Sequence, residues 1–106
     1  MRESSFQSKL IKELETMFPG CLIFKTDPGY KQGIPDLMIL YNDKWAMLEC
    51  KRSPTAHHQP NQEYYIDILN KMSFSRFIDP VNKKEVLDDL QRTFKPIGAT
   101  RLSRSE

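Results

Sequence analysis

The chain has 106 residues, of which 39% are hydrophobic and 28% charged, and its formal net charge is +2. These values are typical of one globular domain, and they exclude a disordered or fibrous chain. We expect a single domain over residues 1–106, with its core at about 3–95 and a loose tail at 96–106. The sequence has no signal peptide and no run near the roughly 20 apolar residues of a membrane span, which predicts a cytoplasmic protein with no membrane contact.

The first predicted element is a helix that begins near Ser4 or Ser5, either of which can cap it. Its apolar residues follow the three- and four-residue spacing of a one-sided helix. They are Phe6, Leu10, Ile11, Leu14, Met17 and Phe18. Pro19-Gly20 ends the helix, and a strand over residues 21–26 follows and closes at a turn.

The next two segments predict a β-hairpin. Residues 37–41 form a continuous apolar run of the kind that is buried on both faces of a sheet. Asn42-Asp43 is a tight turn, and residues 45–51 return beside the first strand. The two cysteines, Cys21 and Cys50, both lie in apolar runs and are expected to be buried free thiols.

The remaining elements complete a mixed α/β domain. A loop over residues 52–61 leads into a helix over 62–71, with Tyr65, Ile66 and Leu69 on its inner face. A strand over 74–78 follows, and Asp79-Pro80 breaks it. Residues 83–94 form a helix with apolar residues on one side: Val86, Leu87, Leu90 and Phe94. The order helix, three strands, helix, strand, helix predicts one central sheet flanked by helices.

Three charged residues stand beside the predicted hairpin where apolar surroundings would ordinarily disfavour them: Asp36, Glu49 and Lys51. In a tight hairpin the start of one strand lies beside the end of the other, so all three meet at the end opposite the turn. Strand alternation puts Glu49 and Lys51 on one face. Any one of these residues alone is better explained by a salt bridge at a sheet end.

Taken together, the three residues suit metal-dependent phosphodiester hydrolysis. Two converging carboxylates repel each other without a cation, and magnesium prefers such oxygen ligands. A lysine beside the ion orients or deprotonates an attacking water, or offsets charge on a phosphate.

The pattern Pro35-Asp36, a short hairpin and then Glu49-Cys50-Lys51 resembles the PD-(D/E)XK nuclease superfamily. Gly33-Ile34-Pro35-Asp36-Leu37 and a following helix that opens with Gln62 look like its VRR-Nuc branch, in the stand-alone form found in phages and bacteria. The resemblance covers residues 3 to about 79. It implies a restriction-endonuclease-like α-β-β-β-α-β core and a cytosolic setting in a bacterium or phage-infected host.

The resemblance also implies roles for individual residues. Asp36, Glu49 and the backbone carbonyl of Cys50 would bind Mg²⁺ or Mn²⁺, and Lys51 would assist the water. Gln59 competes with Gln62 for the position of the family glutamine. Many relatives carry an acidic residue on the first helix, where this chain offers Glu3, Glu13 and Glu15.

Geometry favours Glu3 among these, because the helix N-terminus should approach the site, and Glu13 lies roughly 15 Å further along the axis. Gln7 would then be its neighbour at the site and a candidate for nucleic-acid contact. The alternative is that Glu3 only complements the helix dipole.

Further polar residues are candidates for nucleic-acid contact: Tyr30, Lys31, Arg52, His57 and His58. Tyr30 and Lys31 stand in a loop before Asp36 and would touch phosphate and sugar, or form a solvated loop. His57 and His58 point in different directions and lack a third ligand, so phosphate or solvent contact is favoured over zinc.

The sequence therefore predicts a metal-dependent DNA endonuclease of duplex or branched DNA, including four-way (Holliday) junctions, that acts as a homodimer. A noncatalytic nucleic-acid-binding module of the same fold is the alternative. Trp45 is expected to be a core anchor or a subunit contact.

Overall fold

The computed structural model describes residues 2–95 and shows three helices and four strands. In chain order they are α1 (Glu3–Met17), β1 (Leu22–Lys25), β2 (Leu37–Tyr41), β3 (Lys44–Cys50), α2 (Gln62–Met72), β4 (Ser75–Ile78) and α3 (Lys83–Phe94). This confirms the α/β class and the α-β-β-β-α-β order of the core. The segment 96–106, which was expected to be loose, lies outside the described residues.

The sheet is mixed, as expected, with strand order β1-β2-β3-β4. β1 pairs with β2 and β2 with β3 in antiparallel fashion, whereas β3 and β4 are parallel and α2 makes the crossover between them. The β2–β3 hairpin turns at Asn42, whose φ of 56° lies in the left-handed region that asparagine tolerates. The predicted turn is therefore confirmed.

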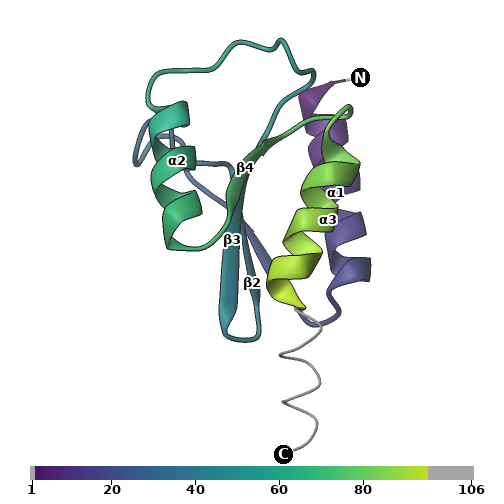
Figure 1. The fold of residues 1–106 in the computed structure, drawn as a ribbon. Helices are drawn as coiled ribbons and strands as arrows, with labels where there is room; N and C mark the ends of the chain where they lie inside the picture. Colours follow the sequence, from purple (N-terminus) through teal and green to yellow (C-terminus); the bar gives the residue numbers. More distant parts are fainter. Residues whose placement is uncertain (1, 96–106) are drawn as a thin grey trace, which may run out of the picture.

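The core lies between the sheet and the pair of helices α1 and α3, which run side by side over one face (Figure 1). Phe6, Leu10 and Leu14 of α1 and its C-cap residue Phe18 are buried, as their spacing predicts. The same cluster holds alternate residues of the strands and the inner face of α3. They are Leu37, Ile39, Ala46, Leu48, Cys50, Ile78, Val86, Leu87, Leu90 and Phe94.

The opposite face of the sheet is only partly covered, because it carries α2 alone (Figure 1). This helix contacts β3 and β4. Leu22 and Phe24 on β1 are 57% and 51% exposed, and Met38 and Leu40 on β2 are half-buried. The prediction that 37–41 is buried on both faces is therefore wrong: one short helix does not extend over all four strands.

The inner face of α2 is less deeply buried than expected for the same reason. Tyr65, Ile66 and Leu69 are half-buried. Trp45 on β3 is half-buried as well, on the face that α2 covers only in part.

Two local predictions need correction. Helix α1 begins at Glu3, one residue after Arg2, and no side chain caps it, so Ser4 and Ser5 lie inside the helix instead of capping it. Ser4 instead accepts a hydrogen bond from the Ser8 hydroxyl at its backbone oxygen. The strand predicted over 21–26 is shorter, because the Cys21 N–H donates to the Phe18 carbonyl at the helix end.

Both cysteines are free thiols, as expected, with Cys50 buried and Cys21 half-buried rather than fully buried. Among residues 2–95, no helix is long and apolar enough to cross a membrane.

Candidate metal centre

The open end of the β2–β3 hairpin brings Asp36 beside Glu49. Leu37 pairs with Leu48, so one further step of the antiparallel register sets these two acidic residues across from each other. The Asp36 carboxylate accepts a hydrogen bond from the backbone N–H of Cys50 at 3.1 Å. On the other side of β2, the N–H of Thr26 donates to the Asp36 carbonyl at 3.0 Å. Hydrogen bonds from the backbone of Cys50 and of Thr26, on the two sides of β2, therefore fix the position of Asp36.

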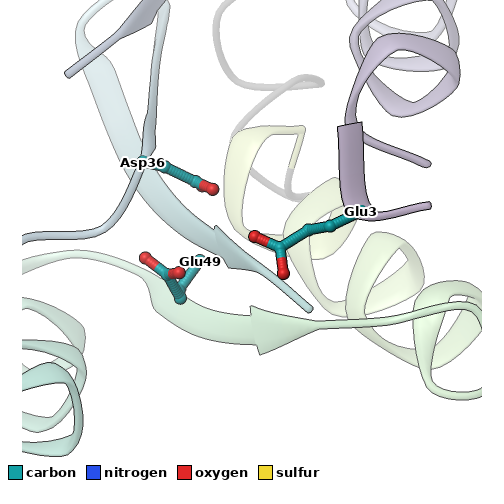
Figure 2. Close-up of side chains that lie close together, drawn as sticks. All are labelled: Glu3, Asp36 and Glu49. Carbon is teal, nitrogen blue, oxygen red and sulfur yellow. The ribbon is translucent and has the colours of Figure 1, made fainter. Parts of the chain in front are cut away.

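The N-terminus of α1 adds a third carboxylate, from Glu3. Figure 2 shows the carboxylates of Glu3, Asp36 and Glu49 turned toward one another, and one oxygen from each lies within 4.8 Å of the others. One turn further along the helix, the Gln7 amide donates to Asp36 Oδ2 at 3.2 Å. We call Glu3, Asp36 and Glu49 the acidic cluster.

The alternative residue on α1, Glu13, lies elsewhere. Its carboxylate accepts from Lys83 on α3 at 2.6 Å. A helix that packs its N-terminal end at the open end of the hairpin carries Glu3 to the acidic cluster and Glu13 away from it.

The acidic cluster carries unbalanced negative charge. Burial and, to a smaller extent, the charge of Glu3 raise the pKa of Asp36 to about 6, against the opposing effect of the Cys50 N–H. Burial and the neighbouring Asp36 raise the pKa of Glu49 to about 8, and Lys51 only partly offsets them. One ammonium therefore does not compensate these carboxylates.

The ammonium of Lys51 is held in a buried chain of hydrogen bonds on the α2 side of the sheet. Its Nζ donates to the His57 carbonyl at 3.0 Å and to Gln62 Oε1 at 2.8 Å, and lies 3.8 Å from Glu49 Oε2. The Gln62 amide donates to the same Glu49 oxygen at 3.1 Å. Lys51 and Glu49 are thus oriented by one shared neighbour at the start of α2.

The two competing glutamines have different positions. Gln62 is buried and joins Glu49 to Lys51, whereas the side chain of Gln59 is exposed and only its backbone N–H donates to Gln62 Oε1, at 2.8 Å. The structure therefore places Gln62, at the opening of α2, beside the acidic cluster.

The donor set fits a hard divalent cation. Three carboxylates supply the oxygen ligands that Mg²⁺ and Mn²⁺ prefer, and a cation there would relieve the repulsion that raises the two pKa values. Cys50 contacts the site through its backbone N–H, and burial raises the pKa of its thiol, which favours the protonated form over a thiolate ligand.

Two of the candidate nucleic-acid contacts bond to the site: the Gln7 amide donates to Asp36, and the backbone carbonyl of His57 accepts from Lys51. Tyr30, which is 82% exposed, and Lys31, Arg52 and His57 all stand in loops. His58 is more constrained than expected: its ring stacks on Phe77 at 3.9 Å between centroids, and its Nδ1 lies 2.9 Å from a Glu63 oxygen.

Sequence reasoning missed two features of the site. The Thr26 hydroxyl donates to the Pro35 carbonyl at 2.8 Å, which holds the residue before Asp36 in place. A cavity of about 390 Å³ opens beside Asp36 and Glu49, between two loops. Neither has a signal in residue spacing, because both depend on how segments far apart in the chain pack.

No protein-family model, curated protein or solved structure matches this chain. Its function must therefore be argued from the acidic cluster, its lysine and the surrounding loops.

Proposed function

We propose that the protein is a metal-dependent DNA endonuclease of the PD-(D/E)XK type, close to its VRR-Nuc branch. One observation carries the proposal: the three carboxylates of the acidic cluster converge within 4.8 Å at a hairpin end where the Lys51 ammonium lies 3.8 Å from Glu49. The sequence pattern that resembles this superfamily and the α-β-β-β-α-β core support the same assignment.

Glu3, Asp36 and Glu49 would hold Mg²⁺ or Mn²⁺, and the Cys50 carbonyl is a further proposed ligand. A divalent ion held by these residues would supply Lewis-acid chemistry, polarising a phosphoryl oxygen and making a water more acidic. The carboxylates fix the position of the scissile phosphate by fixing the ion.

Lys51 acts on the attacking water or on the charge that develops on the phosphate. An ammonium has three N–H donors, and two are used by the His57 carbonyl and Gln62. The third remains for a water or a phosphate oxygen beside Glu49. Gln62 keeps the lysine and the carboxylate in a fixed relation, so it is a positioning residue.

DNA is the proposed substrate, and loop residues around the cluster are its proposed contacts. Lys31 and Arg52 are exposed and carry the positive charge that phosphates attract, with Tyr30 and the two histidines nearby in the same loops. The free thiols of Cys21 and Cys50 suit a reducing compartment, which supports the cytosol of a bacterium or phage-infected cell as the site of action.

The proposal includes a homodimer formed through β1. This strand is an edge of the sheet, and its Leu22 and Phe24 are exposed. Antiparallel pairing of two β1 strands about Ile23 would bring these apolar residues together.

Charge complementarity supports the same arrangement. Pairing about Ile23 sets Lys25 of one copy beside Cys21 of the other, where the charge of Glu15 is close enough to raise the pKa of the thiol. Two copies would present two sites to two strands, as cutting of a four-way junction requires.

The test is cleavage of supercoiled plasmid and of a labelled four-way junction in Mg²⁺, Mn²⁺ or chelator, with Lys51→Ala beside Lys44→Ala. Lys44 begins the same strand at its far end, so it is a matched control. We expect cutting only with metal, a loss of about a hundredfold or more in Lys51→Ala, and wild-type rates in Lys44→Ala. Binding without cutting under every metal condition would replace the proposal with the noncatalytic module.

A further inference from the structure

The cavity that includes Asp36 and Glu49 extends beyond the acidic cluster, to residues that the proposed function does not use, such as Pro28, Gln32 and Ile34. Its volume is about 390 Å³, near the lower end of the roughly 300–1,000 Å³ of small-molecule sites. Asp36, Glu49 and Gln62 line one side of it. A ligand in the cavity therefore lies directly beside the proposed metal ion and the phosphate that it would hold.

The lining suits a neutral ligand with polar edges. It includes the apolar side chains of Pro28 and Ile34, the amides of Gln32 and Gln59, and no lysine or arginine. Beyond the two carboxylates proposed to hold the metal, the lining offers no basic residue to bind a second phosphate. Apolar side chains beside amides suit an uncharged ring with hydrogen-bonding edges.

Two amides in the cavity wall remain available to such a ligand. Gln62 is committed to Lys51, Glu49 and the Gln59 N–H. The side chains of Gln32 and Gln59 are exposed and make no hydrogen bond to another residue of the part that the structure describes. Glutamine amides offer a donor and an acceptor together, the pattern that reads the edge of a nucleobase.

Gly33, which lines the cavity, lies at a close contact between two loops. Gly33 has a φ of +92°, and a Cβ added there would lie 2.6 Å from the Cβ of Asn61. Asn61 itself has a φ of 71°. The two loops therefore meet at a contact that only glycine permits, and the wall has a defined shape.

We propose that this cavity receives one unpaired nucleobase of the strand being cut. The inference rests on the proposed nuclease function and adds the class of substrate. In a nucleic acid the nucleoside is the neutral group next to each phosphate, so a phosphate at the acidic cluster places a base at the cavity mouth. A paired base stays in the stack and cannot enter, whereas a base at a branch point or flap can.

The test uses wild-type protein and three DNA substrates of one sequence. One carries an unpaired nucleotide at a branch, one has an abasic site at that nucleotide, and one is fully paired. The cut is mapped on the first substrate, and a further control moves the abasic site several nucleotides away. We expect removal of the adjacent base to lower the cleavage rate about tenfold to a hundredfold, and removal of the distant base to have no effect.

A double variant, Gln32→Ala with Gln59→Ala, removes the free amides without touching the acidic cluster. We expect it to lose most of the preference for the base-bearing substrate while its cleavage still depends on metal. Gln91→Ala, an exposed glutamine on α3, should keep the full preference.

The outcomes separate this inference from the proposed function. Metal-dependent cutting at equal rates with and without the base overturns the inference and leaves the nuclease function standing. Failure to cut any of the DNA substrates in Mg²⁺ or Mn²⁺ overturns both.

Discussion

The buried chain from Lys51 through Gln62 to Glu49 joins residues that are 11 and 13 positions apart in the sequence. Each member supplies what its neighbour lacks. The ammonium only donates, the carboxylate only accepts, and the glutamine amide does both. Loss of the glutamine leaves two buried charged groups with fewer partners, which is costly in a medium of low polarity.

Gln62→Leu should therefore destabilise the protein by about 1–3 kcal/mol and lower its cleavage rate. Leucine keeps much of the side-chain volume, so the effect reports the lost hydrogen bonds. Urea unfolding measures the stability, and Gln91→Leu on exposed α3 is the control. Equal stability of Gln62→Leu and wild type would show that the chain of hydrogen bonds is not formed in solution.

The raised pKa values of Asp36, about 6, and Glu49, about 8, predict how stability depends on pH when no metal is bound. Above about pH 4.5 the unfolded chain releases both protons, whereas the folded protein retains them up to these higher values. The folded state thus binds more protons, so the free energy of unfolding falls as pH rises from about 5 to 8. The slope is about 1.4 kcal/mol per pH unit for each retained proton.

Urea unfolding in chelator at several pH values measures this dependence. The double variant Asp36→Asn with Glu49→Gln should flatten it. Added Mn²⁺ should raise the melting temperature more at pH 8 than at pH 6, because metal and protons compete for the same oxygens. Constant or rising stability of the metal-free wild type from pH 5 to 8 would contradict the burial of these carboxylates.

Asp36, Glu49 and Lys51 were predictable as neighbours because hairpin pairing and strand alternation are local rules. The cap of α1 was not. Ser4 and Ser5 are good caps by residue type, but the helix extends to Glu3 and carries that carboxylate to the acidic cluster. Residue spacing does not distinguish a helix that begins at Glu3 from one that is capped by Ser4 or Ser5. Packing of Phe6 and Leu10 against the sheet fixes the helix more firmly than its cap does.

At the scale of elements, the site depends on two loops, after β1 and before α2, that meet at Gly33. Gly20 has almost the same φ, +89° against +92°, but open space where a Cβ would be. Substitutions at the two glycines therefore distinguish the effect of backbone strain alone from the added effect of a clash between the loops.

Gly20→Ala should cost about 1–2 kcal/mol from the left-handed backbone alone and leave cleavage unchanged. Gly33→Ala should cost more, because its Cβ would lie 2.6 Å from Asn61 Cβ, and it should also slow cleavage by moving the cavity wall. Thermal unfolding and cleavage rates of the two variants compare them directly. Identical behaviour of both variants would mean that the loops do not touch.

The elements themselves were predicted well where a local signal exists. The turn at Asn42, the break at Asp79-Pro80 and the amphipathic spacing of α3 all gave boundaries close to those observed. Asp79 accepts from the N–H groups of Val81 and Asn82 just before α3, which explains the break. The contact between loops had no such signal, because Gly33 and Asn61 are far apart in the chain.

At the scale of the whole molecule, one face of the sheet packs against α1 and α3, and the other is covered only in part, by α2 (Figure 1). The sequence reading of 37–41 as buried on both faces failed here. An apolar run fits equally a strand inside a monomer and a strand beside an interface, so the sequence did not distinguish the two.

The β1 homodimer predicts that Phe24→Lys gives a monomer. Phe24 is 51% exposed, so a lysine there should not disturb the core, but in each copy it would set a charge opposite the apolar Leu22 of the other copy. Light scattering measures the mass of the wild type and the variant. The matched control is Tyr64→Lys, an exposed aromatic residue on α2, which should remain dimeric. A monomeric wild type at micromolar concentration would reject this interface.

The most direct test of the metal centre is the single-turnover rate of DNA cleavage against Mn²⁺ concentration, for wild type, Asp36→Asn and Asp43→Asn. Asp43 lies in the turn at the other end of the hairpin, so it is the matched control. We expect wild type and Asp43→Asn to show the same saturating, metal-dependent rate, and Asp36→Asn to lose about a hundredfold or more. Cleavage by Asp36→Asn at the wild-type rate, or wild-type cleavage that persists in chelator, would contradict a catalytic metal centre at the acidic cluster.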